Sequence, residues 1–315
     1  MYLNHISVYL PEKVVTNEHF NKLNNLSKEW IVERTGIKQR RKANSTENTH
    51  TMGIAAVDAG SHSLPFENEE IELIIGATYT PHDTIFTLGH AIQHHLNISN
   101  IPVVTISSAC SSLLNAIEIV EGYFATGKAR KALVVVSEHN TAYSNDEDTI
   151  AGHLWGDGAA ALWLSKDKIK ADDLEIKDII TAGAGNVGKA KDAVVLKPID
   201  GGFTMPFGRD VFINACEYMS KVTQNILDKN NCAVEDVDYF IPHQANLRIT
   251  KNVAKTLNLP SEKVISNVEY LGNTGCAGCA IGIAENIGKF KPNDNIVVAV
   301  FGGGYSYGAM LLQQN

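Results

Sequence analysis

The segment IPVVTISSACSSLLNAI, residues 101–117, decides the expected fold of this chain. It begins with a short apolar run that is typical of a buried strand, and from Ser111 its apolar residues have helical spacing. Cys110 therefore stands where a strand passes into the N-terminus of a helix. The positive end of a helix favours a thiolate and lowers the pKa of a thiol, as a nucleophilic cysteine requires. A small buried cysteine is the alternative for this position.

Composition narrows the class of protein. The 315 residues are 44% hydrophobic and 20% charged, which suits one large core or two medium ones. A net charge of −8 argues against a general nucleic-acid binder. The five cysteines are odd in number and sparsely spaced, so a disulfide framework is not expected. With no signal peptide and no apolar stretch of membrane-spanning length, we expect a cytoplasmic protein that engages neither nucleic acid nor membrane.

Strands and helices alternate along the chain. Apolar runs predict strands at 73–77, 103–106, 133–136, 160–164, 239–241 and 296–300. Helical spacing predicts helices at 50–60, 88–96, 111–126, 210–229, 245–257 and 276–289. This alternation predicts an α/β fold whose sheets are covered on both faces.

The second part of the chain echoes the first. Residues 155–162 and 301–309 each combine an aromatic residue, a Gly-x-Gly unit and a strand of small residues. We expect two duplicated halves, 1–165 and 166–315, with the charged stretch 165–178 as the boundary. The alternative is the general likeness of any two α/β halves.

Three further elements have the residue types of acyl-transfer chemistry. His243 directly follows an apolar strand, and Asn273 lies between glycine and small residues. Gly302-Gly303-Gly304 follows another strand and can direct a backbone N–H into a pocket. A structural histidine and a turn asparagine are the alternatives. Together with Cys110 these residues form a plausible acyl-transfer set.

The order and spacing of these motifs resemble β-ketoacyl-acyl carrier protein synthase III, of the thiolase superfamily. The resemblance extends to EWIVERTGI at 29–37, HQANLR at 243–248 and the Gly156-Asp157-Gly158 turn. It covers essentially the whole chain. It implies a thiolase-like five-layered αβαβα sandwich of two duplicated halves, usually assembled as a homodimer.

The resemblance also implies roles for the chemical set. Cys110 would accept the acyl group as a thioester, and His243 and Asn273 would stabilise the enolate formed when malonyl-acyl carrier protein loses CO₂. The amides of Cys110 and Gly303 would form the oxyanion hole. The substrates are thioesters of CoA or of carrier-protein phosphopantetheine, with neither a metal nor a further cofactor expected.

Other positions are implied to contact the substrates or the second subunit. Trp30 and Arg34 match residues that bind the CoA adenine, and Phe86 matches a residue that reaches across the dimer to the partner's acyl pocket. Arg248 matches a carrier-protein contact.

Two lysines extend that last position. Lys251 and Lys255 follow Arg248 at roughly helical spacing and would form a basic patch for an acidic carrier. The alternative for these two lysines is a solvated helix face.

The sequence departs from the family pattern at a few positions. Thr149 stands where a second adenine-binding arginine is common, so a carrier-bound acyl donor stays open beside acyl-CoA. Ser111-Ser112-Leu113 and Thr87 also differ, and we expect these changes to line or adjoin the acyl pocket.

Two other motifs are interpreted structurally. GAGNVG at 183–188 matches a dinucleotide-binding pattern, but the next residues predict a loop and then a strand where that motif needs a helix. Cys276 and Cys279 lack further ligands at zinc-site spacing, so we expect two buried thiols. We expect His90 and His94 at the surface or an interface.

The leading hypothesis is a Cys-His-Asn condensing enzyme that joins an acyl thioester to malonyl-acyl carrier protein. An acyltransferase on the same scaffold, without condensation, is one alternative. A non-catalytic partner subunit is the other. The acyl starter and the pathway are not encoded in any single motif.

Overall fold

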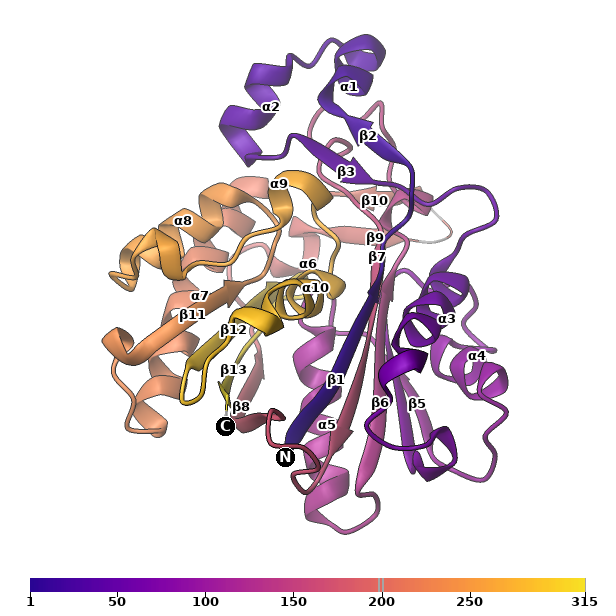
Figure 1. Cartoon of the computed structure of the whole chain (residues 1–315). Helices are drawn as coiled ribbons and strands as arrows, with labels where there is room; N and C mark the ends of the chain where they lie inside the picture. Colours follow the sequence, from indigo (N-terminus) through magenta and orange to yellow (C-terminus); the bar gives the residue numbers. More distant parts are fainter. Residues whose placement is uncertain (198, 200, 315) are drawn as a thin grey trace.

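Nine hydrogen-bonded strands form the centre of the fold (Figure 1). The computed structural model describes residues 1–197, 199 and 201–314, and orders the strands β11-β12-β13-β8-β1-β7-β6-β4-β5. They are β1 (Tyr2–Tyr9), β4 (Leu73–Ala77), β5 (Val103–Ile106), β6 (Lys131–Glu138), β7 (Gly158–Ser165), β8 (Leu174–Gly183), β11 (Val237–Pro242), β12 (Asn295–Gly302) and β13 (Ser306–Gln314). β1 and β8 are joined through Tyr2–Glu175 and Leu3–Leu174, at one end of each strand. Two sheets therefore meet at a corner.

The two sheets have the same connectivity. In the first, β1 pairs antiparallel with β7, β7 pairs antiparallel with β6, and β6 runs parallel to β4. In the second, β8, β13, β12 and β11 repeat this order and these directions. The boundary predicted after residue 165 falls in the connection from β7 to β8, and its position stays a prediction.

Six helices cover and separate the sheets. They are α3 (Thr49–Gly60), α4 (Leu88–His95), α5 (Ser112–Ala125), α7 (Gly208–Lys229), α8 (Leu247–Thr256) and α10 (Ala277–Asn286). One core packs α3 and α4 against the first sheet, and another packs α7 and α8 against the second. The largest core holds α5 and α10 between the sheets. The expected thiolase-like five-layered αβαβα sandwich is confirmed, with α3–α4 and α7–α8 on opposite outer faces in Figure 1.

Several short elements lie outside the nine strands and six helices described above. They are α1 (Asn17–Asn24), α2 (Lys28–Thr35), α6 (Ala190–Ala193) and α9 (Val268–Leu271), with the hairpins β2 (Val14–Thr16)–β3 (Gln39–Arg41) and β9 (Val195–Lys197)–β10 (Gly202–Thr204). Among them, α1, α2, β2 and β3 form the top of Figure 1. Sequence periodicity did not indicate most of these short elements, because runs of three to eight residues carry a weak pattern.

The longer predicted elements are confirmed with shifts at their ends. Strands β1 and β8 were missed, since polar residues interrupt their apolar runs. The loop expected after GAGNVG is instead the one-turn helix α6, followed by β9. A Cβ at Gly188, the last glycine of the motif, would lie 2.6 Å from a carboxylate oxygen of Asp210, so this glycine makes room for an acidic side chain. Within the described ranges, no helix combines the length and apolar character needed to cross a membrane.

Replacing Trp163 of β7 is expected to test the core between α3 and the first sheet. Its side chain is fully buried, and a Cβ at Gly60 would come within 2.5 Å of its ring. Trp163→Ala should lower the free energy of unfolding by about 3–5 kcal/mol in urea titrations. Trp30→Ala, the same change at a half-buried position, should cost clearly less; equal losses would contradict this packing.

Candidate active site

The loop that holds Cys110 is a tight turn between β5 and α5. Ala109 adopts a left-handed conformation with φ of 48°, which an L-residue keeps only when neighbouring contacts hold it. Those contacts come from Ser112, whose Oγ accepts from the N–H of Ser108 at 2.8 Å and donates to the carbonyl of Ala109 at 2.6 Å. The sequence thereby fixes Cys110 at the start of α5.

The glycine triplet packs directly against this turn. A Cβ at Gly302 would lie 2.7 Å from the backbone nitrogen of Cys110, so β12 can end here only with glycine. Ser306, just beyond the triplet, donates from Oγ to the carbonyl of Ser108 at 2.8 Å. The backbone N–H groups of Cys110 and Gly303 lie close enough to the sulfur of Cys110 to favour its thiolate. These are the two amides that the sequence pattern suggested for an oxyanion hole.

His243 follows β11 and is 4% exposed. Its backbone N–H donates to the carbonyl of Ala299 at 2.8 Å, which holds the loop against β12. The fully buried Gln244 donates from Nε2 to the carbonyls of Pro242 at 2.6 Å and Ile265 at 3.2 Å. A side chain that sequence analysis passed over thus anchors the histidine loop.

Gln244 also supports the segment that leads to Asn273. Its Oε1 accepts from the backbone N–H of Asn267 at 3.0 Å. Asn273 itself accepts at Oδ1 from the N–H of Gly275 at 3.0 Å, and its own N–H donates to the carbonyl of Leu154 at 2.8 Å. With Oδ1 engaged in the turn, the Nδ2 group is the end of the amide left for the pocket.

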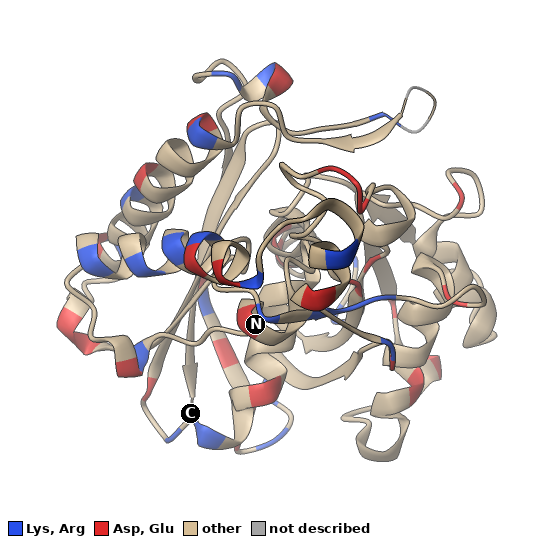
Figure 2. Ribbon diagram, turned by 90° about the horizontal axis from the view of Figure 1, so that it is seen from above, with Lys and Arg blue, Asp and Glu red and all other residues tan. Residues whose placement is uncertain are grey.

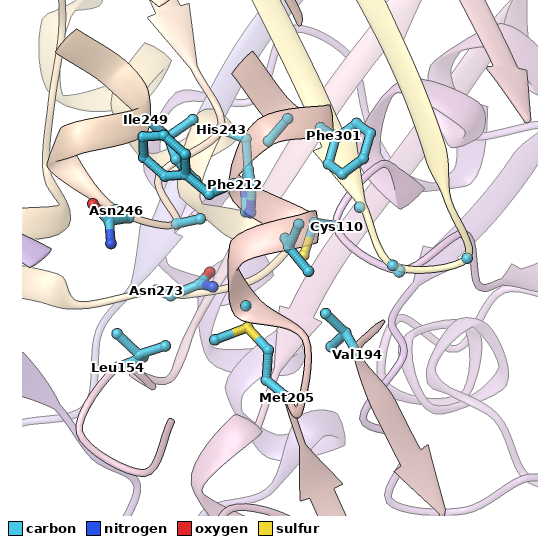
Figure 3. A pocket seen from close by; sticks show the side chains of 18 of the residues that line it. Cys110, Leu154, Val194, Met205, Phe212, His243, Asn246, Ile249, Asn273 and Phe301 are labelled. Atoms are coloured by element: carbon cyan, nitrogen blue, oxygen red, sulfur yellow. The ribbon is translucent and has the colours of Figure 1, made fainter. Parts of the chain in front are cut away.

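The loops of Cys110, His243, Asn273 and the glycine triplet meet at one cavity of about 340 Å³. Figure 3 shows Cys110, His243 and Asn273 projecting from three separate segments towards a common space. The walls are largely apolar and come from the β9–β10 hairpin, α7, α8 and the residues before the Gly156 turn. They include Leu154, Trp155, Val194, Leu196, Phe203, Met205, Val211, Phe212, Ala215, Met219, Ile249 and Phe301. Cys110, His243, Asn273 and Gly303 all line this cavity, as expected.

Comparison with known proteins identifies the family. The C-terminal model of 3-oxoacyl-[acyl-carrier-protein] synthase III matches residues 227–314, and the model of the preceding part matches residues 104–183. The β-ketoacyl-[acyl-carrier-protein] synthase III of Aquifex aeolicus is 34% identical over 97% of both chains. The chain belongs to the 3-oxoacyl-[acyl-carrier-protein] synthase III family. The resemblance drawn from its motifs is confirmed.

Solved structures agree with this assignment. The crystal structure of the Aquifex aeolicus synthase III superposes with a TM-score of 0.91 and covers 99% of both chains at 34% identity. The priming β-ketosynthase of the R1128 polyketide pathway superposes with a TM-score of 0.88 at 27% identity, over 99% of this chain and 96% of that one. Both solved structures share the architecture described above for this chain.

The electrostatics of Cys110 differ from the expectation for a helix N-terminus. Burial raises the pKa of Cys110 to about 12, and the negative charge of Glu138 acts in the same direction. Hydrogen bonds from Tyr79 and from the N–H groups of Cys110 and Gly303 oppose this shift. The thiol is therefore protonated at rest, because desolvation outweighs the favourable donors.

Burial also determines the charge of His243. It lowers the pKa of this imidazole to about 4, so the ring is neutral at physiological pH. A neutral ring keeps one N–H to donate and one nitrogen to accept. The site thus presents neutral donors around the sulfur.

A buried acid and a second thiol lie behind Cys110. Glu138 accepts hydrogen bonds from Thr78 at 3.1 Å and from Cys276 Sγ at 2.9 Å, and burial raises the pKa of Glu138 to about 7. Cys276 and Cys279 are both buried, as expected. Glu138 could not be predicted as part of the site, because a single acidic residue at the end of a strand forms no recognisable sequence motif. Among the described residues, no group of three or more His, Cys, Asp or Glu side chains is arranged to hold a metal ion.

Trp30 and Arg34 lie on α2, outside the residues that line the cavity. The guanidinium of Arg34 stacks over the Trp30 ring at 4.7 Å from the ring centre. The carbonyl of Arg34 accepts from Nδ2 of Asn246 at 3.3 Å, and Asn246 does line the cavity. The helix is therefore tied to the cavity rim at one point.

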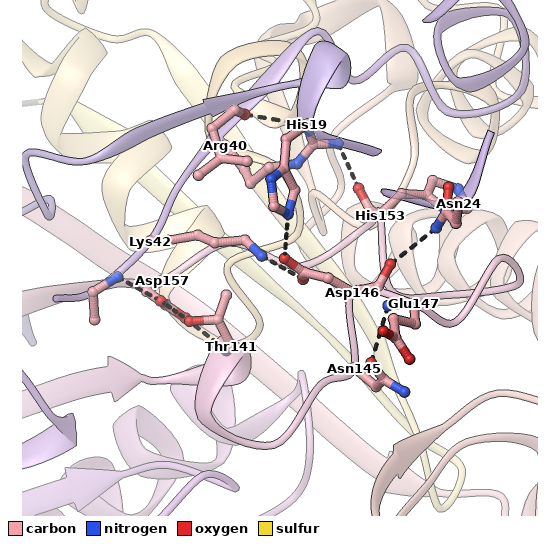
Figure 4. Close-up of polar contacts among 12 residues, drawn as sticks. His19, Asn24, Arg40, Lys42, Thr141, Asn145, Asp146, Glu147, His153 and Asp157 are labelled. Carbon is pink, nitrogen blue, oxygen red and sulfur yellow. Dashed lines mark hydrogen bonds and ion pairs between the residues drawn. The ribbon is translucent and has the colours of Figure 1, made fainter. Parts of the chain in front are cut away.

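The segment that contains Thr149 is bound to the N-terminal elements (Figure 4). Asp146 pairs with His19 at 2.7 Å and with Lys42, while the carbonyl of His153 accepts from Arg40. Thr149 is exposed, and so is Glu147, whereas Asp148 between them is half-buried. No arginine occupies this segment.

The other predicted contact residues lie on the surface. Arg248, Lys251 and Lys255 are exposed on α8, which has no acidic residue, and Figure 2 shows how basic and acidic segments otherwise intermingle. Arg248 stacks over Phe212, a residue of the cavity wall, at 5.6 Å. Phe86 is 48% exposed beside α4, where its ring meets His50, His90 and His94.

The departures from the family pattern affect the turn more than the cavity. Ser111 and Ser112 are fully buried, and Ser111 Oγ lies 3.0 Å from Ser306 Oγ. Leu113 packs in the core between the sheets. Thr87 hydrogen-bonds Thr105 at 2.8 Å near α4. None of these residues lines the cavity itself, but Ser111 adjoins Cys110, and the side chains of Ser111 and Ser112 support the backbone around it. That these positions line or adjoin the acyl pocket stays a prediction.

The reactivity of Cys110 towards iodoacetamide should show which electrostatic effect prevails. With a pKa near 12, the thiolate fraction, and with it the alkylation rate, should rise steadily from pH 7 to pH 10. Peptide mass spectrometry separates Cys110 from the buried Cys276 and Cys279, which should label far more slowly. A rate that levels off near pH 7 would contradict the raised pKa.

His243 should remain neutral across the physiological range. Its lowered pKa means that the folded protein takes up this proton only near pH 4, below the ordinary histidine range. ¹⁵N-histidine NMR between pH 5.5 and 8 should show a ring signal that does not titrate and that is missing from His243→Asn. Titration of that signal near pH 6.5 would contradict the burial argument.

Proposed function

We propose that this chain catalyses decarboxylative condensation of an acyl thioester with malonyl-acyl carrier protein, through an acyl group carried on Cys110. The observation that carries the proposal is the convergence of Cys110, His243 and Asn273 in one apolar cavity, with the N–H groups of Cys110 and Gly303 close enough to the sulfur to favour its thiolate. The family assignment supports the same chemistry.

The first half-reaction is acyl exchange. The sulfur of Cys110 forms a bond to the acyl carbon of the donor as the bond from that carbon to the donor sulfur breaks. The proton of Cys110 ends on the departing thiol, so no net charge is produced. During transfer the carbonyl oxygen becomes negative, and the Cys110 and Gly303 amides are placed to donate to it.

The second half-reaction forms a carbon–carbon bond. The malonyl thioester loses CO₂, and the electron pair of the broken bond passes to the thioester as an enolate. Asn273 Nδ2 and the N–H of neutral His243 would donate to the enolate oxygen. The α-carbon then attacks the acyl-cysteine and the bond from the acyl carbon to the sulfur of Cys110 breaks, giving the β-ketoacyl product and a Cys110 thiolate that takes up one proton from solvent to restore the resting thiol. Neutral donors suit this step because they stabilise the oxygen without protonating the carbanion.

Substrate contacts follow from the surroundings of the cavity. We assign Trp30 and Arg34 to the nucleotide of a CoA donor, supported by the link from Arg34 to Asn246 at the rim. We assign Arg248, Lys251 and Lys255 to the acidic carrier protein, supported by the uniformly basic face of α8 next to Phe212. A homodimer in which Phe86 enters the partner's site agrees with the exposure of that ring in the single chain. No resident cofactor is required by these steps.

CO₂ release from malonyl-carrier protein tests the condensation. Asn273→Ala should slow CO₂ release by about 100–1000-fold, since one donor to the developing charge is lost, while acylation of Cys110 persists in intact-mass measurements. Asn44→Ala, the same change at an exposed site, should leave both unchanged. Acylation of the unaltered protein without any CO₂ release would overturn condensation in favour of simple acyl transfer. Failure to acylate Cys110 with any CoA or carrier donor would overturn both.

A further inference from the structure

Tyr79 lines the cavity together with Cys110 and favours its thiolate, although the Cys-His-Asn set does not include it. The residue follows β4 and lines the cavity beside Cys110. Its hydroxyl donates to Oδ1 of Asn140 at 2.8 Å, and it lies close enough to the side chain of Cys110 to favour the thiolate. One tyrosine therefore joins the nucleophile to a buried amide.

Asn140 holds this hydroxyl in place. It is fully buried, and its Nδ2 donates to the carbonyls of Gly156 at 2.7 Å and Asn273 at 3.2 Å. Both ends of the amide are thus engaged, which fixes its orientation. The chain of contacts runs from Cys110 through Tyr79 and Asn140 to the backbone of the Asn273 loop.

The position of the hydroxyl also depends on a glycine. Gly275 has φ of 58°, and a Cβ on it would lie 2.2 Å from the hydroxyl oxygen of Tyr79. The aromatic ring meets Phe203 edge-on at 6.0 Å between ring centres. The space around Tyr79 is therefore filled on several sides, and the hydroxyl is held where it reaches the sulfur.

We propose that Tyr79 is a fourth catalytic residue, whose hydroxyl donates to the sulfur of Cys110 while that sulfur carries negative charge during acyl transfer. This inference rests on the proposed acylation of Cys110. In the resting site the hydroxyl donates to Asn140, and its oxygen can accept from the thiol. When the thiol proton leaves for the departing thiol of the donor, rotation about the C–O bond turns the hydroxyl proton to the sulfur.

The phenol neither gains nor loses a proton in this step. Burial raises the pKa of Tyr79 well above its ordinary value, so the hydroxyl stays protonated and remains a donor. Together with the amides of Cys110 and Gly303 it gives the sulfur three donors. A donor to a charged acceptor is stronger than one between neutral groups, so its effect should appear when the thiolate forms.

Iodoacetamide alkylation of Cys110 tests this without any acyl or malonyl substrate. Tyr79→Phe removes only the hydroxyl, and at pH 9 it should slow alkylation by about tenfold, with the rate–pH curve displaced upward by about one pH unit. Tyr143→Phe is the matched control, because the Tyr143 hydroxyl donates to the carbonyl of Pro81. An unchanged curve for Tyr79→Phe would overturn the proposal.

A second substitution guards against a purely structural effect of the lost hydroxyl. Incorporation of 3,5-difluorotyrosine at position 79 keeps the hydroxyl and makes it a stronger donor, so alkylation at pH 6.5, where the more acidic fluorinated phenol stays protonated in this buried place, should become faster. Opposite displacements for Phe and difluorotyrosine support the proposal, whereas displacement in one direction for both would overturn it. CO₂ release measures condensation separately from alkylation. An unchanged alkylation curve would therefore contradict only the role of Tyr79, and an absence of CO₂ release would contradict only the proposed condensation.

Discussion

The close approach of Gly302 to the backbone of Cys110 is the constraint on which the site depends. A side chain at Gly302 would push β12 away from the turn, since its Cβ would lie 2.7 Å from the nitrogen of Cys110. The contact joins the end of β12, in the second sheet, to the start of α5, which follows β5 of the first sheet. The same approach brings the next residue, Gly303, close enough for its N–H to favour the thiolate. Residues from both halves of the fold thus form one site, at the contact between Gly302 and Cys110.

Burial gives this site its chemical character. The same desolvation that keeps His243 neutral also keeps the thiol of Cys110 protonated. In such surroundings hydrogen-bond donors act strongly on any charge that develops, because little water competes with them. The proposed chemistry uses charge that forms transiently on sulfur and oxygen, so fixed neutral donors suit it better than permanent ions. Tyr79 extends this arrangement by adding a hydroxyl to two backbone amides.

Two buried amides hold the loops of the site together. Gln244 connects the His243 loop to the segment before Asn273, and Asn140 connects Tyr79 to the carbonyls of Gly156 and Asn273. Each is fully buried, so a lost partner would leave a polar group without compensation. This cost makes the loop positions mutually dependent. The central helices α5 and α10 pack in one core between the sheets, and this core supports the loops at the ends of the helices.

The sequence by itself determined the alternation of strands and helices, the family and the chemical set of Cys110, His243, Asn273 and the glycine triplet. These are local properties: apolar periodicity, small residues at turns and reactive side chains after strands. The tertiary structure was needed to find the strands β1 and β8, the engagement of Ser111 and Ser112 within the turn, and the place of Tyr79 in the cavity of Cys110 with its hydrogen bond to Asn140. So did the raised pKa of Cys110, which the helix N-terminus alone would have lowered. Burial and contacts between residues about 30 to 200 positions apart decide these features, and neither is written in a local pattern.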